Sequence, residues 1–396
     1  MPSTNNDPSG AIGPSDPRFE VELQLRGARL ADFLDDIEPP NNLDEFKKVL
    51  AENRASPGPD TNAIKVFRQL LSQAASEAGV TQSCLERALP CIEEALLAQD
   101  QETVTDKQWS RTILLEPDRS PPLSACKPDQ TFGWSLDAFP FRFDRVTQAL
   151  KSFLRPVATY PLLHWAYFTV EAKGAKKTLR EARLQNLHNG AVMLNNMLCI
   201  KQALGKEAVE AFLNQIHVAS LELTTETIQI SGYWASSAAD GSVKFYGITV
   251  GCWTPNDPEG KQFGQARKAA LNAIAWMRKE THASVSKDMQ AYEMKLARQE
   301  AERLEAQTRY SQQRAALTPP SSQSGRPVQA EKSSKRLRSI GNLGNPPQSK
   351  LTRSSQSTAS TDFVHLDDHE PVSSDETTAL AENLQNKPGA YSSPPT

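Results

Sequence analysis

The sequence predicts an α/β domain, built as a mixed β-sheet flanked by helices, with a long C-terminal helix and disordered termini. Three observations predict this class. Short runs of aromatic and β-branched residues, typical of strands, alternate with segments whose apolar residues recur every three or four positions, typical of helices. A charged segment near the C-terminus keeps a helical pattern with only a weak apolar stripe. Both ends of the chain are rich in Ser and Pro, a composition that does not support a packed core.

Composition and charge narrow the class further. The 396 residues are 38% hydrophobic, below the usual level of about 45–50%, and include 27 prolines, which indicates a folded middle between disordered ends. The formal net charge is −3, so nucleic-acid binding would need a local basic patch. The cysteines form no Cys-x-x-Cys pair, which favours buried reduced thiols over a zinc site. The N-terminus lacks the pattern of a signal peptide and no segment has about 18 consecutive apolar residues, so we expect an intracellular protein without a membrane span.

The first part of the chain is expected to be mainly helical. Residues 1–18 should be disordered, and Phe19–Leu25 alternates apolar and polar residues as a short strand does. A helix should begin at Asn42, because Asn is a common N-cap residue. Two further helices should run from about Ile64 to Gly79 and from about Ser83 onward.

The middle of the chain carries the predicted sheet. Its candidate strands are short, apolar and rich in aromatic and β-branched residues, and they lie at 130–134, 164–170, 216–223, 227–234 and 243–253. The turn at 239–241 should join the last two as a hairpin. The apolar spacing predicts the intervening and closing helices at 139–154, from Thr178 onward, and at 263–277.

The triplet Glu171-Ala172-Lys173 ends the second of these strands. Side chains alternate between the two faces of a strand, so Glu171 and Lys173 should point the same way. Burying two polar groups without partners would cost on the order of 2–7 kcal/mol each. The pattern therefore predicts a cleft that holds another charge or a metal ion.

A second carboxylate lies at the edge of another strand. Pro128-Asp129 directly precedes the 130–134 run, and Asp137 is a rival acid in a loop-like segment. Two carboxylates beside a lysine suit Mg²⁺, which takes one or two carboxylates, keeps several waters and completes its shell with substrate phosphates. A turn aspartate after proline is the alternative explanation of Asp129.

The order Pro128-Asp129, a gap of tens of residues, then Glu171-Ala172-Lys173 at a strand end resembles the PD-(D/E)XK nuclease superfamily, and in particular the nuclease-like domains of fungal proteins. The resemblance covers about residues 55–278. It implies a restriction-endonuclease-like core, Mg²⁺ or Mn²⁺ as cofactor, and nucleic acid as substrate. It also implies that Asp129, Glu171 and the Ala172 carbonyl hold the metal.

The same resemblance implies two further members of the site. An acidic residue on the first core helix would be Glu77, with Glu86, Glu93 and Glu94 as rivals. A polar residue on the helix after the Glu-x-Lys strand would be Gln185. Without the resemblance, Glu77 is interpreted as a solvent-exposed residue at a helix end. Gln185 is then an ordinary polar residue beside the apolar face of its helix.

A basic segment follows the triplet. Three of its cations, Lys176, Arg180 and Arg183, are spaced to lie on one helix face. We expect this basic ridge to contact a phosphodiester backbone. The ridge comprises Lys176, Lys177, Arg180 and Arg183. A solvated helix start is the alternative. Such a ridge would position nucleic acid while the carboxylates and the metal perform the chemistry.

The chain is thus expected to comprise a disordered segment 1–18, a nuclease-like domain 19–283, a charged helix 284–317 and a disordered tail 318–396. The charged helix could bind a protein partner. The tail holds a basic cluster at 332–338 that would suit nuclear import. Two alternatives to a nuclease stay open: an inactive module that binds nucleic acid or protein, and a scaffold that acts through the charged helix and tail.

Overall fold

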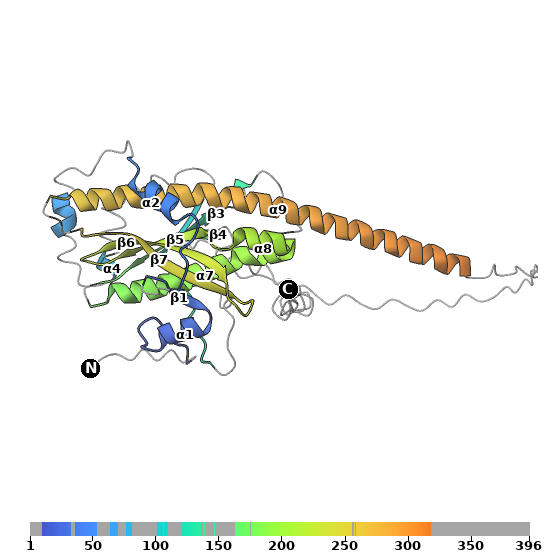
Figure 1. Cartoon of the computed structure of the whole chain (residues 1–396), viewed down its shortest axis with the longest axis horizontal. Coiled ribbons are helices and arrows are strands. Elements are labelled where there is room, and N and C mark those ends of the chain that lie inside the picture. Colours follow the sequence, from blue (N-terminus) through green and yellow to red (C-terminus); the bar gives the residue numbers. More distant parts are fainter. Residues whose placement is uncertain are drawn as a thin grey trace, which may run out of the picture. The chain divides into compact units, whose positions relative to one another are not determined.

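The α/β class is confirmed by a computed structural model, shown in Figure 1. The chain divides into two compact units, and the sheet belongs to the one that includes the residues up to Ala301. The residues that the structure describes are 10–32, 36–53, 64–69, 77–80, 101–105, 107–109, 120–135, 138–139, 146, 163–174, 176–255, 257 and 259–317. In this part of the chain no helix is long and apolar enough to cross a membrane.

Within the described residues, one seven-stranded mixed sheet forms the centre of the domain, in the order β1-β7-β6-β5-β4-β3-β2. The pairs β1–β7 and β4–β5 are parallel and the other neighbours are antiparallel. The strands are β1 (Ala28–Leu30), β2 (Gln101–Thr105), β3 (Gln130–Trp134), β4 (His164–Ala172), β5 (Ile216–Leu223), β6 (Ile228–Ser237) and β7 (Val243–Trp253). The expected strands at 130–134, 164–170, 216–223, 227–234 and 243–253 are confirmed.

Helices cover both faces of the sheet (Figure 1). One face is covered by α7 (Leu179–Leu204), and the other by the first part of α9 (Lys261–Leu317) together with α2 (Leu43–Ala51). The strand alternation explains this arrangement: Thr169 bonds to α7, while Phe168 lies on the opposite side and packs against Phe132. The shorter helices are α1 (Phe19–Leu25), α4 (Glu77–Val80) and α8 (Lys206–Phe212).

The start of α7 is fixed by a capping box. The Thr178 side chain accepts the N–H of Glu181, and the Glu181 carboxylate accepts the N–H of Thr178, so both groups at the open helix end are satisfied. Farther along, a Cβ on Gly190 would lie 2.6 Å from the Tyr233 ring of β6. The lack of a side chain there lets α7 lie close to the sheet.

The expected closing helix 263–277 and charged helix 284–317 form a single helix, α9. The intervening residues 278–283 contain neither Gly nor Pro, so nothing interrupts the helix. Val285, Met289 and Tyr292 are buried in the core. The weak apolar stripe of the charged segment therefore belongs, in its first turns, to the packing of the domain.

Phe19–Leu25 is a helix, and the strand expected there is wrong. Phe19, Glu22 and Leu23 are its buried residues, at the i, i+3 and i+4 spacing of one helix face. The Glu22 carboxylate accepts from the buried Arg26 guanidinium at 2.7 Å. The helix expected at 139–154, the helix after Ser83 and the disorder expected at 318–396 fall mostly or wholly outside the described residues.

Candidate functional site

The ends of β3 and β4 bring Asp129 next to the Glu171 triplet. Gln130, the first residue of β3, pairs with Val170 across the antiparallel ladder, so Asp129 lies near the end of β4, where its charge acts on Glu171. The Asp129 Oδ2 accepts the backbone N–H of Ala172 at 2.6 Å. This bond fixes one carboxylate at the end of the strand that carries the other.

Glu171 and Lys173 contact each other on that face. The Lys173 Nζ lies 3.4 Å from Glu171 Oε2, and the two side chains are 5% and 0% exposed. Burial raises the pKa of Glu171 well above its ordinary value; the Lys173 ammonium lowers it in part, and the Asp129 carboxylate raises it further. Glu171 and Lys173 therefore share a region of low dielectric, where their charges interact more strongly than they would in water, and the half-buried Asp129 lies near it.

Helix α7 supplies the remaining contacts of Glu171. Asn189 Nδ2 donates to Glu171 Oε1 at 3.1 Å and to Asn186 Oδ1 at 3.2 Å. Asn186 Oδ1 also accepts from Thr169 Oγ1 at 3.0 Å, and Asn186 Nδ2 donates to Glu222 Oε1 at 2.9 Å. A continuous chain of hydrogen bonds thus links Glu171 to Glu222.

Glu222 is a second fully buried carboxylate, and it is the register partner of Glu171 on the parallel strand β5. Burial raises its pKa, and hydrogen bonds from Ser220, Asn186 and Ser231 lower it in part. Both of its oxygens accept hydrogen bonds from side chains of the same face: Asn186, Ser220, Gln229, Ser231 and Tyr233.

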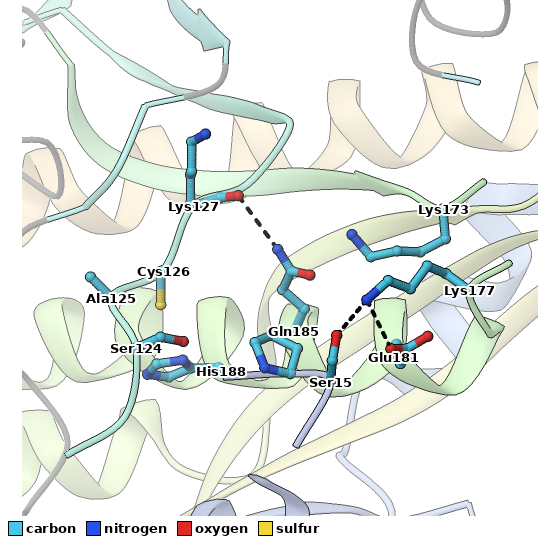
Figure 2. Close-up of a pocket in the computed structure, with 11 residues that line it drawn as sticks. Ser15, Ser124, Ala125, Cys126, Lys127, Lys173, Lys177, Glu181, Gln185 and His188 are labelled. Carbon is cyan, nitrogen blue, oxygen red and sulfur yellow. Dashed lines mark hydrogen bonds and ion pairs between the residues drawn. The ribbon is translucent and has the colours of Figure 1, made fainter. Parts of the chain in front are cut away.

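A pocket of about 230 Å³ opens beside Lys173 (Figure 2). Figure 2 shows the amines of Lys173 and Lys177 directed toward it and the Lys127 side chain directed away. His188 lines this pocket, and burial is the main cause that lowers its pKa to about 4. The residues that line it come from the N-terminal segment, the segment before β3, the segment between β4 and α7, and the start of α7: Pro14, Ser15, Ser124, Ala125, Cys126, Lys127, Lys173, Lys177, Glu181, Gln185 and His188.

The other expected site residues are placed as follows. Gln185 lines this pocket and donates to the Lys127 carbonyl at 3.4 Å, so it lies close to the site. Ala172 lies on β4 between the two charged residues, and its N–H donates to Asp129. Glu77 is the first residue of α4, and its side chain is outside the described part of the structure.

The basic segment is largely paired with acids from the N-terminal segment. Arg180 forms an ion pair with Glu20, and Arg183 forms one with Asp32. Lys177 contacts Glu181 at 3.3 Å and the Ser15 hydroxyl. The sequence around the ridge shows only Glu181 as an opposing charge, whereas the fold brings Glu20 and Asp32 to it from about 150 residues away.

The residues present fit a hard divalent cation. Asp129 and Glu171 supply carboxylate oxygens, and the fully buried Asn189 Oδ1 has no hydrogen-bond partner among the described residues. With both acids ionised, the two carboxylates and Lys173 leave one net negative charge. The described residues contain no group of three or more His, Cys, Asp and Glu side chains that could hold a metal.

Fold and site together define an α/β domain in which Glu171 and Lys173, at the end of β4, lie beside Asp129, the residue before β3. The chain belongs to the family described as a domain of unknown function (DUF7924), whose model matches residues 65–288. The matched region includes the strand-end acids, Lys173 and all of α7. No curated protein matches the sequence.

Sequence reasoning missed Glu222, Asn186 and Asn189. A signal was present, because Ser220 and Glu222 alternate in one strand and Gln229 and Ser231 alternate in the next. Polar residues at every second position of two apolar strands indicate a polar face inside the core, which requires hydrogen-bond partners.

Proposed function

We propose that this protein is a metal-dependent, nuclease-like enzyme that hydrolyses phosphodiester bonds of nucleic acids. The observation that carries the proposal is the 2.6 Å bond from the Ala172 N–H to Asp129, which holds that carboxylate beside Glu171 and Lys173. The resemblance of Pro128-Asp129 and Glu171-Ala172-Lys173 to the PD-(D/E)XK pattern supports it.

In this proposal Asp129 and Glu171 bind Mg²⁺ or Mn²⁺, with the Ala172 carbonyl as a further ligand. A bound cation of this type polarises a phosphate and lowers the pKa of a bound water. Lys173 orients that water or offsets the charge that develops on the phosphate, a role suited to a positioned and desolvated ammonium. Gln185 and Glu77 complete the pocket, and Lys176, Lys177, Arg180 and Arg183 contact the backbone of the substrate.

The test uses the purified full-length chain with DNA and RNA substrates, in Mg²⁺, in Mn²⁺ and in EDTA. Lys173→Ala and Asp129→Asn are compared with Lys206→Ala, which removes an exposed lysine of α8. We expect cation-dependent cleavage by the wild type and the control, and loss of cleavage in the two site variants. Cleavage that is equal in EDTA and in all variants would overturn the proposal.

One observation favours a second candidate, an inactive module that binds nucleic acid or protein. Glu171 and Lys173 are both buried and pair with each other, so they neutralise each other without a cation. This candidate predicts salt-sensitive binding that neither EDTA nor Asp129→Asn changes. Cation-dependent cleavage would exclude it.

An intracellular and nuclear location is part of the proposal, because it would bring the site to its substrate. The basic cluster at 332–338 supports nuclear import. A fluorescent fusion tests this: alanine substitution of Lys332, Lys335, Arg336 and Arg338 should move the signal out of the nucleus. A protein partner of the charged helix would contact exposed apolar side chains such as Met294, Leu304 and Tyr310.

A further inference from the structure

The hydrogen-bond chain beneath the site runs in one direction. Glu222 accepts from five side-chain donors and so acts as an acceptor, whereas the amide of Asn both donates through its nitrogen and accepts through its oxygen. Asn186 must therefore turn its nitrogen toward Glu222, where Nδ2 and Oε1 are 2.9 Å apart. Its oxygen is then left to face Asn189 and Thr169.

The same logic fixes the next amide. Because Asn186 presents an oxygen, Asn189 must present its nitrogen, and this nitrogen also reaches Glu171 Oε1 at 3.1 Å. The other oxygen of Glu171, Oε2, lies on the side of Lys173 at 3.4 Å. Each oxygen of Glu171 thus has its own donor, and the carboxylate is held in one orientation.

We propose that Glu222 is the anchor of this chain, and that Asn186 and Asn189 are positioning residues that orient the Glu171 carboxylate toward Lys173 and Asp129. The inference rests on the proposed function for its purpose, which is to present Glu171 Oε2 to the cation. It does not rest on that function for its geometry. Partners behind metal ligands typically change metal affinity about 10–100-fold when they are removed.

Burial makes the anchor effective. Glu222, Asn186 and Asn189 are 0% exposed, so no bulk water competes with the chain or lets an amide turn at low cost. Glu222 Oε2 accepts from Ser231 at 2.9 Å, on the oxygen that does not face Asn186. Ser231→Ala therefore removes a donor from the same carboxylate without touching the path to Glu171, and serves as the matched control.

The first experiment needs neither metal nor activity. The full chain is labelled with ¹⁵N-asparagine and its side-chain amide resonances are recorded in EDTA. We expect Glu222→Gln to shift the Asn189 side-chain resonance. Gln can donate as well as accept, so it no longer requires the Asn186 and Asn189 amides to keep their present orientations. Asn186→Ala should shift the same resonance, and Ser231→Ala should leave it nearly unchanged. An Asn189 resonance that both Glu222→Gln and Asn186→Ala leave in place would overturn the inference.

The second experiment titrates Mn²⁺ by calorimetry into folded wild type and variants. We expect Glu222→Gln, Asn186→Ala and Asn189→Ala each to weaken binding by about tenfold or more, and Ser231→Ala to change it less than about twofold. Glu222→Gln combined with Asn189→Ala should be no weaker than Asn189→Ala alone, because Glu222 acts through Asn189. Fully additive losses would contradict that order of action.

The two failures are distinguishable. A wild type that binds no Mn²⁺, together with the expected shift of Asn189, removes the proposed function and leaves the orientation of Glu171 by Glu222 standing. Mn²⁺ binding by the wild type together with an unchanged Asn189 resonance removes the positioning role and leaves the metal site standing.

Discussion

Asp129 directly precedes β3, next to the Gln130–Val170 pair, and the backbone N–H of Ala172, between Glu171 and Lys173, donates to its carboxylate. Asp129 therefore has a structural task in addition to its proposed chemical one. It satisfies the N–H of Ala172, a residue that is fully buried. The two tasks can be separated by substitution.

Asp129→Ala should lower the free energy of unfolding by about 1–3 kcal/mol, because the Ala172 N–H loses its acceptor in a buried position. Asp129→Asn should cost much less, because the Asn oxygen can still accept that bond. Urea unfolding of the metal-free protein measures both. Equal losses in the two variants would show that the charge, and not the hydrogen bond, stabilises the strand end.

The placement of Glu171 and Lys173 on one face could be predicted because strand alternation is a local property. Their position near Asp129 depends on the β3–β4 register, which the sequence does not state. The part played by Glu222 depends on a parallel pairing that forms only when α7 crosses between β4 and β5. Such non-local pairings set which polar faces meet.

The segment Phe19–Leu25 shows the limit of periodicity in a short run. Phe19 and Leu23 are four positions apart, so they fit one face of a helix as well as one face of a strand. Packing against α7 favours the helix: the Phe19 ring packs edge-on against the His188 ring, with 5.9 Å between the ring centroids. The ion pairs of Arg180 and Arg183 could not be predicted either, because their partners Glu20 and Asp32 are distant in sequence.

The pairing of the ridge predicts a gain of nucleic-acid binding. Glu20→Gln with Asp32→Asn should free Arg180 and Arg183 to contact phosphates, so the affinity for DNA or RNA should rise. The slope of log K against log salt should steepen by up to about 2, since each phosphate contact contributes about 0.9. Fluorescence anisotropy of labelled oligonucleotides over a salt series measures both quantities.

The matched control for that experiment is Asp44→Asn with Glu45→Gln. It changes the net charge by the same amount in the first turn of α2, away from the ridge. Equal tightening in the two double variants would assign the effect to net charge and not to the release of Arg180 and Arg183.

His217 should make stability depend on pH. Burial is the main cause that lowers the pKa of His217 to about 4, although its Nε2 bonds to the Phe212 carbonyl at 2.7 Å. Between about pH 6.5 and 4 the unfolded chain binds a proton at this residue that the folded chain does not, so stability falls on acidification. The full effect is up to about 3 kcal/mol, since each pKa unit corresponds to about 1.4 kcal/mol.

His217→Gln should remove this contribution, because Gln can donate to the Phe212 carbonyl but does not titrate. The free energy of unfolding of the variant should then fall less steeply from pH 6.5 to 4 than that of the wild type. Urea titrations at several pH values measure the two slopes. Identical slopes would mean that His217 does not contribute to acid sensitivity.

Two glycines in helices should respond to alanine with opposite signs. A Cβ on Gly190 would lie 2.6 Å from the Tyr233 ring, so Gly190→Ala must push α7 away from β6. This strain should cost about 1–3 kcal/mol.

Gly264 in α9 has nothing within 4 Å of an added Cβ. Gly264→Ala should therefore stabilise the protein by roughly 0.5–1 kcal/mol, because it lowers the entropy of the unfolded chain and favours the helix. Thermal and urea unfolding measure both variants, and a Gly190→Ala protein as stable as the wild type would show that α7 does not pack against Tyr233 as closely as the structure has it.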